Sequence, residues 1–78
     1  MEDYLRTTLV ELLNYLAGLE GRIGEVGASR EASTIAFERA QSLSNAAKDI
    51  RDVYDESEWT PATHGLLGDI RDGRQILS

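Results

Sequence analysis

The chain has 78 residues and a mass of 8.6 kDa, and its 14 acidic and 8 basic side chains give it a formal net charge of −6. This length accommodates one domain, 1–78, and the apolar fraction of 41% is that of a globular protein rather than of a disordered tail. The chain has no cysteine, which excludes disulfides and thiolate metal sites as a source of stability. Helix packing or self-association must therefore stabilise the small core.

The first predicted element is a helix over residues 3–26. Aliphatic side chains recur in it at spacings of 4, 3, 4, 3, 4 and 3 residues, which is typical of one stripe along an α-helix. This aliphatic stripe consists of Leu5, Leu9, Leu12, Leu16, Leu19, Ile23 and Val26. A second stripe of small or weakly polar residues has the same period and consists of Thr7, Val10, Asn14, Ala17, Gly21 and Gly24. We interpret this small-residue stripe either as a contact surface, for the third helix, a partner subunit or a target protein, or as the mark of a flexible helix that frays or kinks after Ala17.

The second predicted element is a helix over residues 30–57. Its apolar stripe mixes alanines with larger side chains, and consists of Ala36, Ala40, Leu43, Ala47, Ile50 and Tyr54. Between the two helices, Gly27 can take the left-handed conformation that ends a helix, and Ser29 can cap the next one. Because the connection is so short, we expect the two helices to be antiparallel neighbours.

A short third helix is predicted over residues 61–77. Thr60-Pro61 reads as a cap followed by a proline at the first helical position. Leu66, Ile70 and Leu77 would form its apolar face. The three glycines of this segment each weaken a helix by roughly 1 kcal/mol relative to alanine. We therefore expect a marginal helix that depends on docking.

The predicted fold class is all-α, an antiparallel helical hairpin with a short C-terminal third helix. An isolated hairpin leaves the far side of its apolar stripes exposed, which is a thin core for a protein of this size. We expect two hairpins to close that core as a homodimeric helical bundle. The side chains expected to self-associate are Leu9, Leu12, Leu16, Leu43, Ala47 and Ile50. The alternative is a monomeric three-helix bundle in which residues 61–77 cover the stripe.

Five carboxylates lie within residues 49–58, near the C-terminus of the second predicted helix. The helix dipole disfavours negative charge at that end, so these residues do not stabilise the helix. We interpret them as a surface for a basic protein partner, with an ordinary solvated face as the alternative. The predicted partner-binding residues are Glu38, Asp49, Asp52, Asp55, Glu56 and Glu58.

The sequence predicts no catalytic, cofactor or metal site. His64 is the only histidine, and no carboxylate stands at a spacing that would orient it as a general base, so a surface or helix-end role is favoured. Phosphate-binding glycine loops, calcium loops and nucleophile elbows do not occur. Direct binding of nucleic acid is disfavoured because it depends on clustered Lys and Arg, which a chain at −6 lacks.

A cytoplasmic protein that contacts no membrane is expected. No apolar run approaches the roughly 20 residues needed to span a bilayer. The acidic start of the chain also lacks the basic residues of a signal peptide.

In its small size, acidity, lack of cysteine and helical character, the chain resembles the small phage-encoded inhibitors called anti-CRISPR proteins, several of which imitate the charge of nucleic acid. The residues on which the resemblance depends are chiefly Asp49, Asp52, Asp55, Glu56 and Glu58. The resemblance implies binding to a CRISPR surveillance complex in the host cytoplasm and the blocking of target DNA.

An alternative function is a structural or assembly module, such as an antitoxin-like or chaperone-like partner subunit. In that case another chain would complete the aliphatic stripe of the first helix. A third class, an enzyme, would require an activity that depends on His64.

Overall fold

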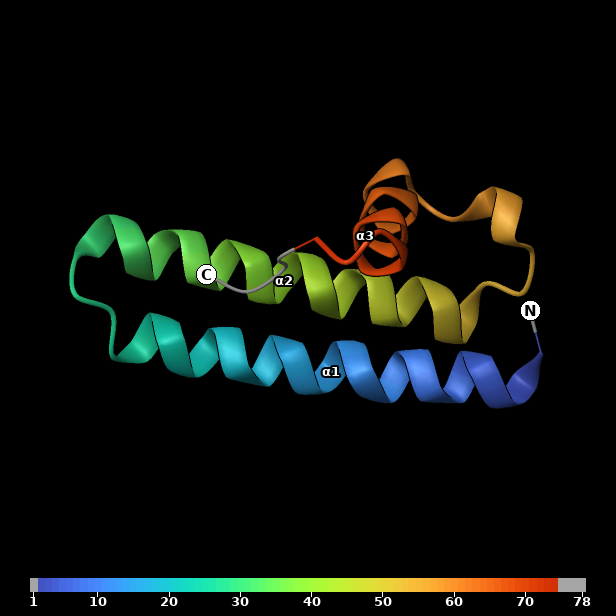
Figure 1. Ribbon diagram of the computed structural model, residues 1–78, viewed down its shortest axis with the longest axis horizontal. Helices are drawn as coiled ribbons and strands as arrows, with labels where there is room; N and C mark the ends of the chain where they lie inside the picture. Colours follow the sequence, from blue (N-terminus) through green and yellow to red (C-terminus); the bar gives the residue numbers. More distant parts are fainter. Residues whose placement is uncertain (1, 75–78) are drawn as a thin grey trace.

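Two long antiparallel helices form the body of the protein, and a shorter third helix lies across one of them (Figure 1). The computed structural model describes residues 2–74. Within this range the elements are α1 (Asp3–Glu25), α2 (Arg30–Asp52), the 3-10 helix η1 (Glu56–Glu58) and α3 (Pro61–Arg71). These residues contain no strand. The prediction of an all-α hairpin with a short third helix is confirmed.

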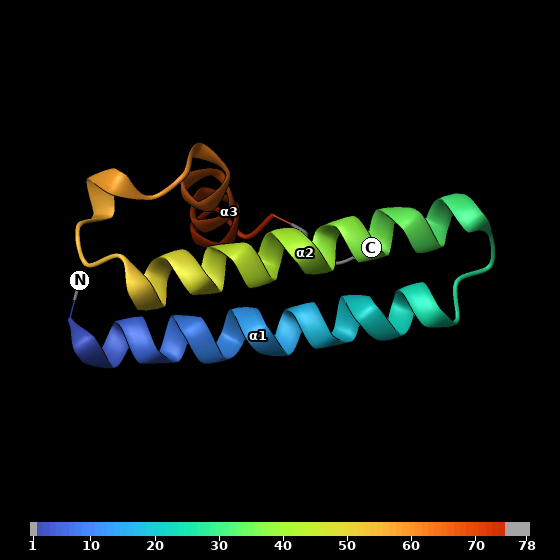
Figure 2. The same ribbon diagram turned by 180° about the vertical axis from the view of Figure 1, so that it is seen from behind.

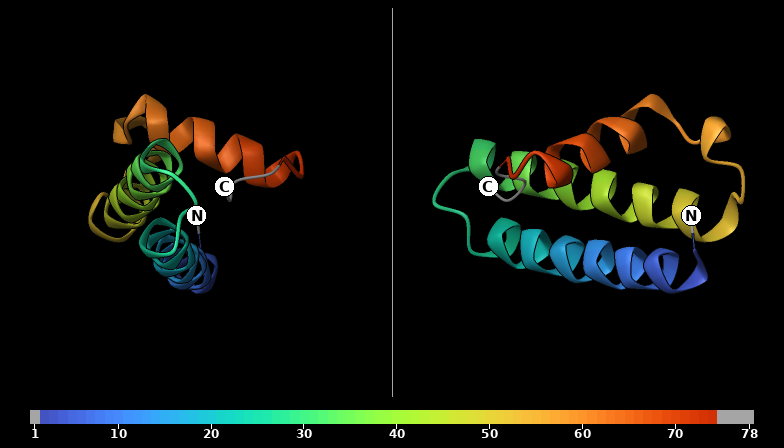
Figure 3. Two further views of the ribbon diagram at one scale, coloured as in Figure 1. Left: turned by 90° about the vertical axis from the view of Figure 1, so that its left-hand side faces the viewer. Right: turned by 45° about the vertical axis from the view of Figure 1, so that its right-hand side comes forward.

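The long helices are neighbours along their whole length. The view from behind shows α1 and α2 side by side from the turn to the opposite end of the molecule (Figure 2). The view along the helix pair shows α3 crossing over α2 (Figure 3). The result is a rod with extents of 40 × 20 × 19 Å.

A tight turn at residues 27–29 joins α1 to α2. The Ser29 hydroxyl oxygen accepts a hydrogen bond from the Ala32 backbone N–H at 3.1 Å, so the predicted N-cap is confirmed. Gly27 does not adopt the expected left-handed conformation, since Gly73 has the only positive φ within residues 2–74. The packing at position 27 nevertheless favours glycine: a Cβ atom there would lie 2.5 Å from the Ser33 hydroxyl oxygen, which would have to move.

The face of α1 that packs on α2 is rotated away from the aliphatic stripe. Its buried residues are Leu13, Ala17, Glu20 and Gly24. At 3.6 residues per turn, their mean direction is about a quarter turn from the centre of the stripe. Leu5, Leu12 and Val26 therefore remain 48%, 39% and 82% exposed. The stripe was expected to be the buried face of α1, but none of its residues is fully buried. Leu9, Leu16, Leu19 and Ile23 are half-buried.

Small side chains on α1 explain this rotation. Ala17 and Gly24, both from the small-residue stripe, are buried and allow the two helices to approach closely. The Phe37 ring of α2 lies over Gly24, where a Cβ atom would be 2.8 Å from the nearest ring carbon. Two residues of the small-residue stripe, Ala17 and Gly24, are therefore contacts inside one chain, whereas Thr7 and Asn14 of the same stripe are exposed. The helix does not fray after Ala17, which was part of the alternative interpretation, because α1 continues to Glu25.

The core corrects part of the predicted self-association surface. The core residues are Leu13, Ala17, Leu43, Ala46, Ala47, Ile50 and Trp59. Leu43, Ala47 and Ile50 are at most 3% exposed in the single chain, because the alanine-rich face of α2 is covered by α1. They are therefore unavailable for contact with a second chain. Of the other three residues expected to self-associate, Leu12 is exposed and Leu9 and Leu16 are half-buried.

The second helix ends at Asp52, not at residue 57 as predicted. Val53 has an extended backbone, with φ −105° and ψ 109°. Local polar groups favour this early end. The Asp55 carboxylate accepts a hydrogen bond from the Ser57 backbone N–H at 3.0 Å, which competes with continuation of the helix. The helical period continues through Tyr54, so the apolar pattern alone could not reveal this.

The third helix begins where the sequence predicts. The Thr60 hydroxyl oxygen accepts a hydrogen bond from the Thr63 backbone N–H at 3.3 Å, and Pro61 is the first helical residue. Apolar side chains on the inner side of α3 pack against the core, namely Leu66, Leu67 and Ile70.

The third helix ends at Arg71, earlier than predicted. Gly73 follows with φ 73°, a left-handed conformation that glycine adopts without strain. The predicted helix over 61–77 is therefore too long, because residues 72–74 are not helical. The remainder of that prediction, including Leu77, lies outside the described residues.

The close packing at Gly24 predicts a difference between two glycine substitutions in α1. Gly18→Ala should raise the free energy of unfolding by about 0.5–1 kcal/mol, because a Cβ atom there meets nothing within 4 Å. Gly24→Ala should gain less or lose stability, because the Phe37 ring would have to move. Urea denaturation of both variants measures the difference. Equal gains at the two positions would contradict the packing of α1 on Phe37.

Candidate protein-interaction surface at the acidic end of the helix pair

One end of the helix pair gathers carboxylates from two separate parts of the chain. The N-terminus of α1 lies beside the end of α2, as Figure 1 and Figure 2 show from opposite sides. The exposed carboxylates at this end, which we call the acidic pole, are Glu2, Asp3, Asp52, Asp55, Glu56 and Glu58. The sequence analysis identified the last four. It missed Glu2 and Asp3, because their place at this end depends on the antiparallel pairing of the helices.

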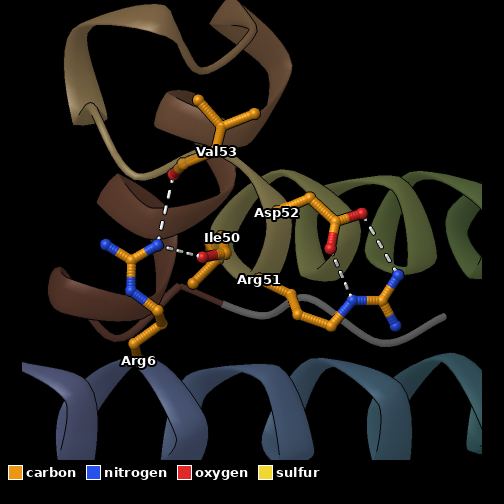
Figure 4. A network of polar contacts seen from close by, with 5 residues as sticks. All are labelled: Arg6, Ile50, Arg51, Asp52 and Val53. Atoms are coloured by element: carbon orange, nitrogen blue, oxygen red, sulfur yellow. Dashed lines mark hydrogen bonds and ion pairs between the residues drawn. The ribbon is translucent and has the colours of Figure 1, made fainter.

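Arg6 ties the start of α1 to the end of α2 (Figure 4). Its Nη1 donates to the Ile50 carbonyl oxygen at 2.5 Å and to the Val53 carbonyl oxygen at 3.2 Å. Its Nη2 donates to the Tyr54 carbonyl oxygen at 3.2 Å, and the guanidinium carbon lies 5.0 Å from the centroid of the Tyr54 ring. Arg6 therefore supplies donors to carbonyl groups in and just beyond the last turn of α2, where a cation also complements the helix dipole.

The segment after α2 is held by Trp59. This side chain is 5% exposed, and its Nε1 donates to the Val53 carbonyl oxygen at 2.9 Å. The Asp55 carboxylate also accepts a hydrogen bond from the Ser57 hydroxyl at 2.8 Å. Because the contacts of Trp59 and Asp55 hold this segment in place, the exposed residues Glu56 and Glu58 of η1 have ordered positions.

Two carboxylates of the acidic pole have neighbours that favour their ionised form. Arg51 Nε and Nη2 donate to the two carboxylate oxygens of Asp52 at 2.8 and 3.2 Å (Figure 4). The hydrogen bond from Arg51 lowers the pKa of Asp52, and the hydrogen bond from the Ser57 hydroxyl lowers the pKa of Asp55. Both groups therefore remain negatively charged at neutral pH and below it.

Asp49, which was predicted to bind a partner, forms its hydrogen bonds inside the protein. Its Oδ2 accepts from the Thr63 hydroxyl at 2.7 Å, and from the Thr60 hydroxyl and backbone N–H at 3.1 and 3.2 Å. The hydrogen bond from Thr63 is the main cause that lowers the pKa of Asp49. A carboxylate at the N-terminus of α3 also complements the helix dipole. Asp49 thus fastens α3 to α2 and does not belong to the acidic pole.

Glu38 also lies away from the acidic pole. It is exposed in the first half of α2, and 14 residues separate it from Asp52, which is about 21 Å along a helix. The helical period predicted that Glu38 and Asp52 share one polar face of α2. Residues on one face can still lie far apart along the helix, whereas the carboxylates of the acidic pole all lie at one end of the helix pair.

Two further titratable residues were placed by the structure. Glu20 of α1 is 0% exposed on the face that packs against the core, a position that the apolar pattern did not predict. His64 is exposed on α3, and its ring centroid lies 5.8 Å from that of Trp59. Residues 2–74 contain no group of three or more His, Asp and Glu side chains that could hold a metal ion.

None of the helices in the described part of the chain has the length and hydrophobicity needed to cross a bilayer. Comparison of the chain with protein families, with curated proteins and with solved structures found no match.

Replacing Arg6 should weaken the end of the helix pair. Arg6→Met is expected to lower the free energy of unfolding by roughly 2 kcal/mol, because carbonyl groups near the end of α2 lose a charged donor. Arg39→Met is the matched control, since Arg39 is exposed on α2 and forms no hydrogen bond or ion pair within residues 2–74. Urea denaturation measures both variants. Similar losses in the two would show that the contacts of Arg6 contribute no specific stability.

The hydrogen bonds of Asp49 predict a pH dependence of stability. Because its folded pKa is lowered, its contribution is full above the unfolded pKa and is lost as the pH falls through the folded pKa. Asp49→Asn should therefore be less stable than the wild type at pH 6, and the difference should shrink at about pH 3. Denaturation at both pH values measures this, with Glu38→Gln, an exposed carboxyl of the same helix, as the control. A difference that stays constant with pH would contradict the role of the ionised Asp49.

Proposed function

We propose that the protein is a non-enzymatic interaction module whose acidic pole binds a basic, nucleic-acid-binding surface of a protein complex. The observation that supports this proposal is the gathering of six exposed carboxylates, from two segments of the chain, at one end of the rod. Arg51 lies beside the acidic pole and is paired with Asp52, whereas the second nearby cation, Arg6, is directed at backbone carbonyls. Negative charge therefore dominates the surface at this end.

The acidic pole is also held in place before it meets a partner. Arg6 fixes the start of α1 against the end of α2, and Trp59 fixes the segment that follows. A charged surface that is already ordered loses less conformational entropy on binding than a flexible acidic tail does. Its field would also accelerate encounter with a basic partner at low ionic strength.

In this proposal the protein acts as anti-CRISPR proteins do. The acidic pole would occupy a basic groove of a CRISPR surveillance complex in the host cytoplasm and prevent target DNA from entering. The proposal also includes self-association, with the homodimer as the active form.

A second candidate function is an assembly module, and one observation favours it specifically. The aliphatic stripe of α1 is partly open, with Leu5, Leu12 and Val26 at 48%, 39% and 82% exposure. Such a stripe is typical of a subunit that is completed by another chain. This candidate predicts binding that depends on α1 and not on the acidic pole.

Competition with target DNA tests the proposed function. A purified CRISPR surveillance complex with its guide RNA is mixed with labelled target DNA, and the retained DNA is measured by gel shift as the protein is added. We expect the wild type to displace the DNA. The double variant Asp52→Lys/Glu58→Lys should require on the order of tenfold more protein, because it reverses two charges of the acidic pole.

The matched control is Glu25→Lys/Glu38→Lys, which changes the net charge equally but away from the acidic pole. It should compete almost as well as the wild type. Displacement that is equally weak for both double variants would assign the effect to net charge alone. No displacement by the folded wild type would overturn the proposed inhibition of this complex.

A further inference from the structure

Most of the large apolar side chains that are exposed within residues 2–74 lie on the outer side of α1 or, for Val26, just beyond its end. Five side chains there, which we call the outer face of α1, are exposed to solvent: Tyr4, Leu5, Leu12, Tyr15 and Val26. α3 does not cover them, because it packs mainly on α2. Aromatic side chains are prominent in this set, as in many interface cores. The face is uncharged along its centre, although the chain as a whole carries −6.

The overall dimensions show that a single chain is unusually open. Its accessible surface is 5390 Å², whereas a compact monomer of this mass exposes about 4,700 Å². Its radius of gyration is 12.8 Å, against about 11.5 Å for a compact domain of this length. Both differences are in the direction expected for an elongated rod of 40 × 20 × 19 Å.

The area of the outer face suits a dimer. From their exposed fractions, its five side chains leave on the order of 600 Å² open in each copy. Pairing two such faces would bury roughly 1,200 Å² in total, at the lower end of specific protein interfaces. Complete burial of both outer faces would thus reach the lower limit of area for a specific interface.

The order of residues along α1 favours an antiparallel arrangement. The aliphatic stripe runs from Leu5 to Val26 and is centred at Leu16. A two-fold axis near Leu16 would therefore bring the stripe of one copy against the stripe of the other along its whole length. Glu11 and Arg22 flank the outer face on the same side, and both are exposed. They stand almost equally far from Leu16 in opposite directions, so the same axis brings Glu11 of each copy to Arg22 of the other.

The position of the acidic pole points to the same arrangement. It lies at one end of a rod 40 Å long, so a parallel pair would place two acidic poles side by side. An antiparallel pair separates them by well over the Debye length, which is about 8 Å at physiological ionic strength. Electrostatic repulsion between the copies is then small.

We infer that a second copy of this chain binds to the outer face of α1, antiparallel and two-fold symmetric, with Glu11 of each copy paired with Arg22 of the other. This inference rests on the homodimer of the proposed function and names its surface. It replaces the contact residues on α2 that the sequence analysis expected, because those residues are buried within one chain.

The first experiment measures the molar mass of the full chain by light scattering and sedimentation over a range of concentrations. We expect twice the chain mass of 8.6 kDa. Leu12→Glu should weaken dimerisation on the order of 100-fold, because it places a carboxylate at the centre of the interface. Asn14→Glu is the matched control, since it adds the same charge to an exposed position of α1 away from the outer face, and should leave the mass unchanged. Circular dichroism confirms that both variants are helical.

A charge exchange tests the antiparallel arrangement independently of Leu12. Glu11→Arg and Arg22→Glu should each weaken dimerisation by roughly 3- to 10-fold, because each creates like-charge pairs between copies. The double variant Glu11→Arg/Arg22→Glu should restore it. The two positions are about 16 Å apart on one helix, so the restoration cannot arise within a single chain.

Three outcomes would overturn the inference. A wild-type chain that remains at the monomer mass at every concentration excludes the dimer. A dimer that tolerates Leu12→Glu as well as Asn14→Glu uses another surface. A double charge variant that is no better than the single variants excludes the antiparallel pairing. None of these measurements involves a basic partner, so each is distinct from failure of the DNA competition.

Discussion

The close packing of α1 on α2 through small side chains is the constraint on which the rest of the structure depends. Gly24 makes room for the Phe37 ring, and Ala17 faces a core to which α2 contributes Ala46 and Ala47. Helices approach most closely where such residues meet, and each ångström of approach increases the number of favourable van der Waals contacts. That contact determines the rotation of α1 about its own axis. The larger aliphatic side chains are then directed to one flank, where the core reaches only some of them.

The antiparallel pairing has a second consequence at the end opposite the turn. There the exposed carbonyl groups of α2 meet the first turn of α1, and Arg6 is positioned to donate to them. The same pairing brings Glu2 and Asp3 to the end of α2. Arg6, one of the two cations near the acidic pole, is thus directed inward at backbone oxygens, whereas the carboxylates of the pole are exposed. A structural requirement, the completion of a helix end, therefore helps to leave a surface with excess negative charge.

Much of the fold could be predicted from the sequence because its signals are local. The apolar period gave two long helices, Ser29 gave the start of α2, and Thr60-Pro61 gave the start of α3. The rotation of α1 could not be predicted, because leucine spacing shows that a stripe exists and not which edge of it a neighbour covers. The end of α2 was missed because the apolar period continues past it. The contacts that favour this end are the hydrogen bond between Ser57 and Asp55 and those that Arg6 and Trp59 donate to carbonyl groups there, and none of them appears in the apolar pattern. In the candidate site, the carboxylates at 52–58 could be recognised in the sequence as a cluster. The internal role of Asp49 could not be predicted, because it depends on how α3 packs against α2.

The two proposed surfaces, the outer face of α1 and the acidic pole, depend on different interactions and lie on different parts of the rod. Apolar contact on the outer face of α1 is nearly independent of salt, whereas attraction at the acidic pole weakens as ionic strength rises. The sequence keeps them separate: the carboxylates of the acidic pole lie at one end, and the positions along the centre of the outer face carry no charge. A net charge of −6 opposes self-association only where the charges approach each other. Because the proposed antiparallel arrangement would keep the acidic poles apart, a chain this acidic could pair through α1 and still present both poles to the proposed basic partners.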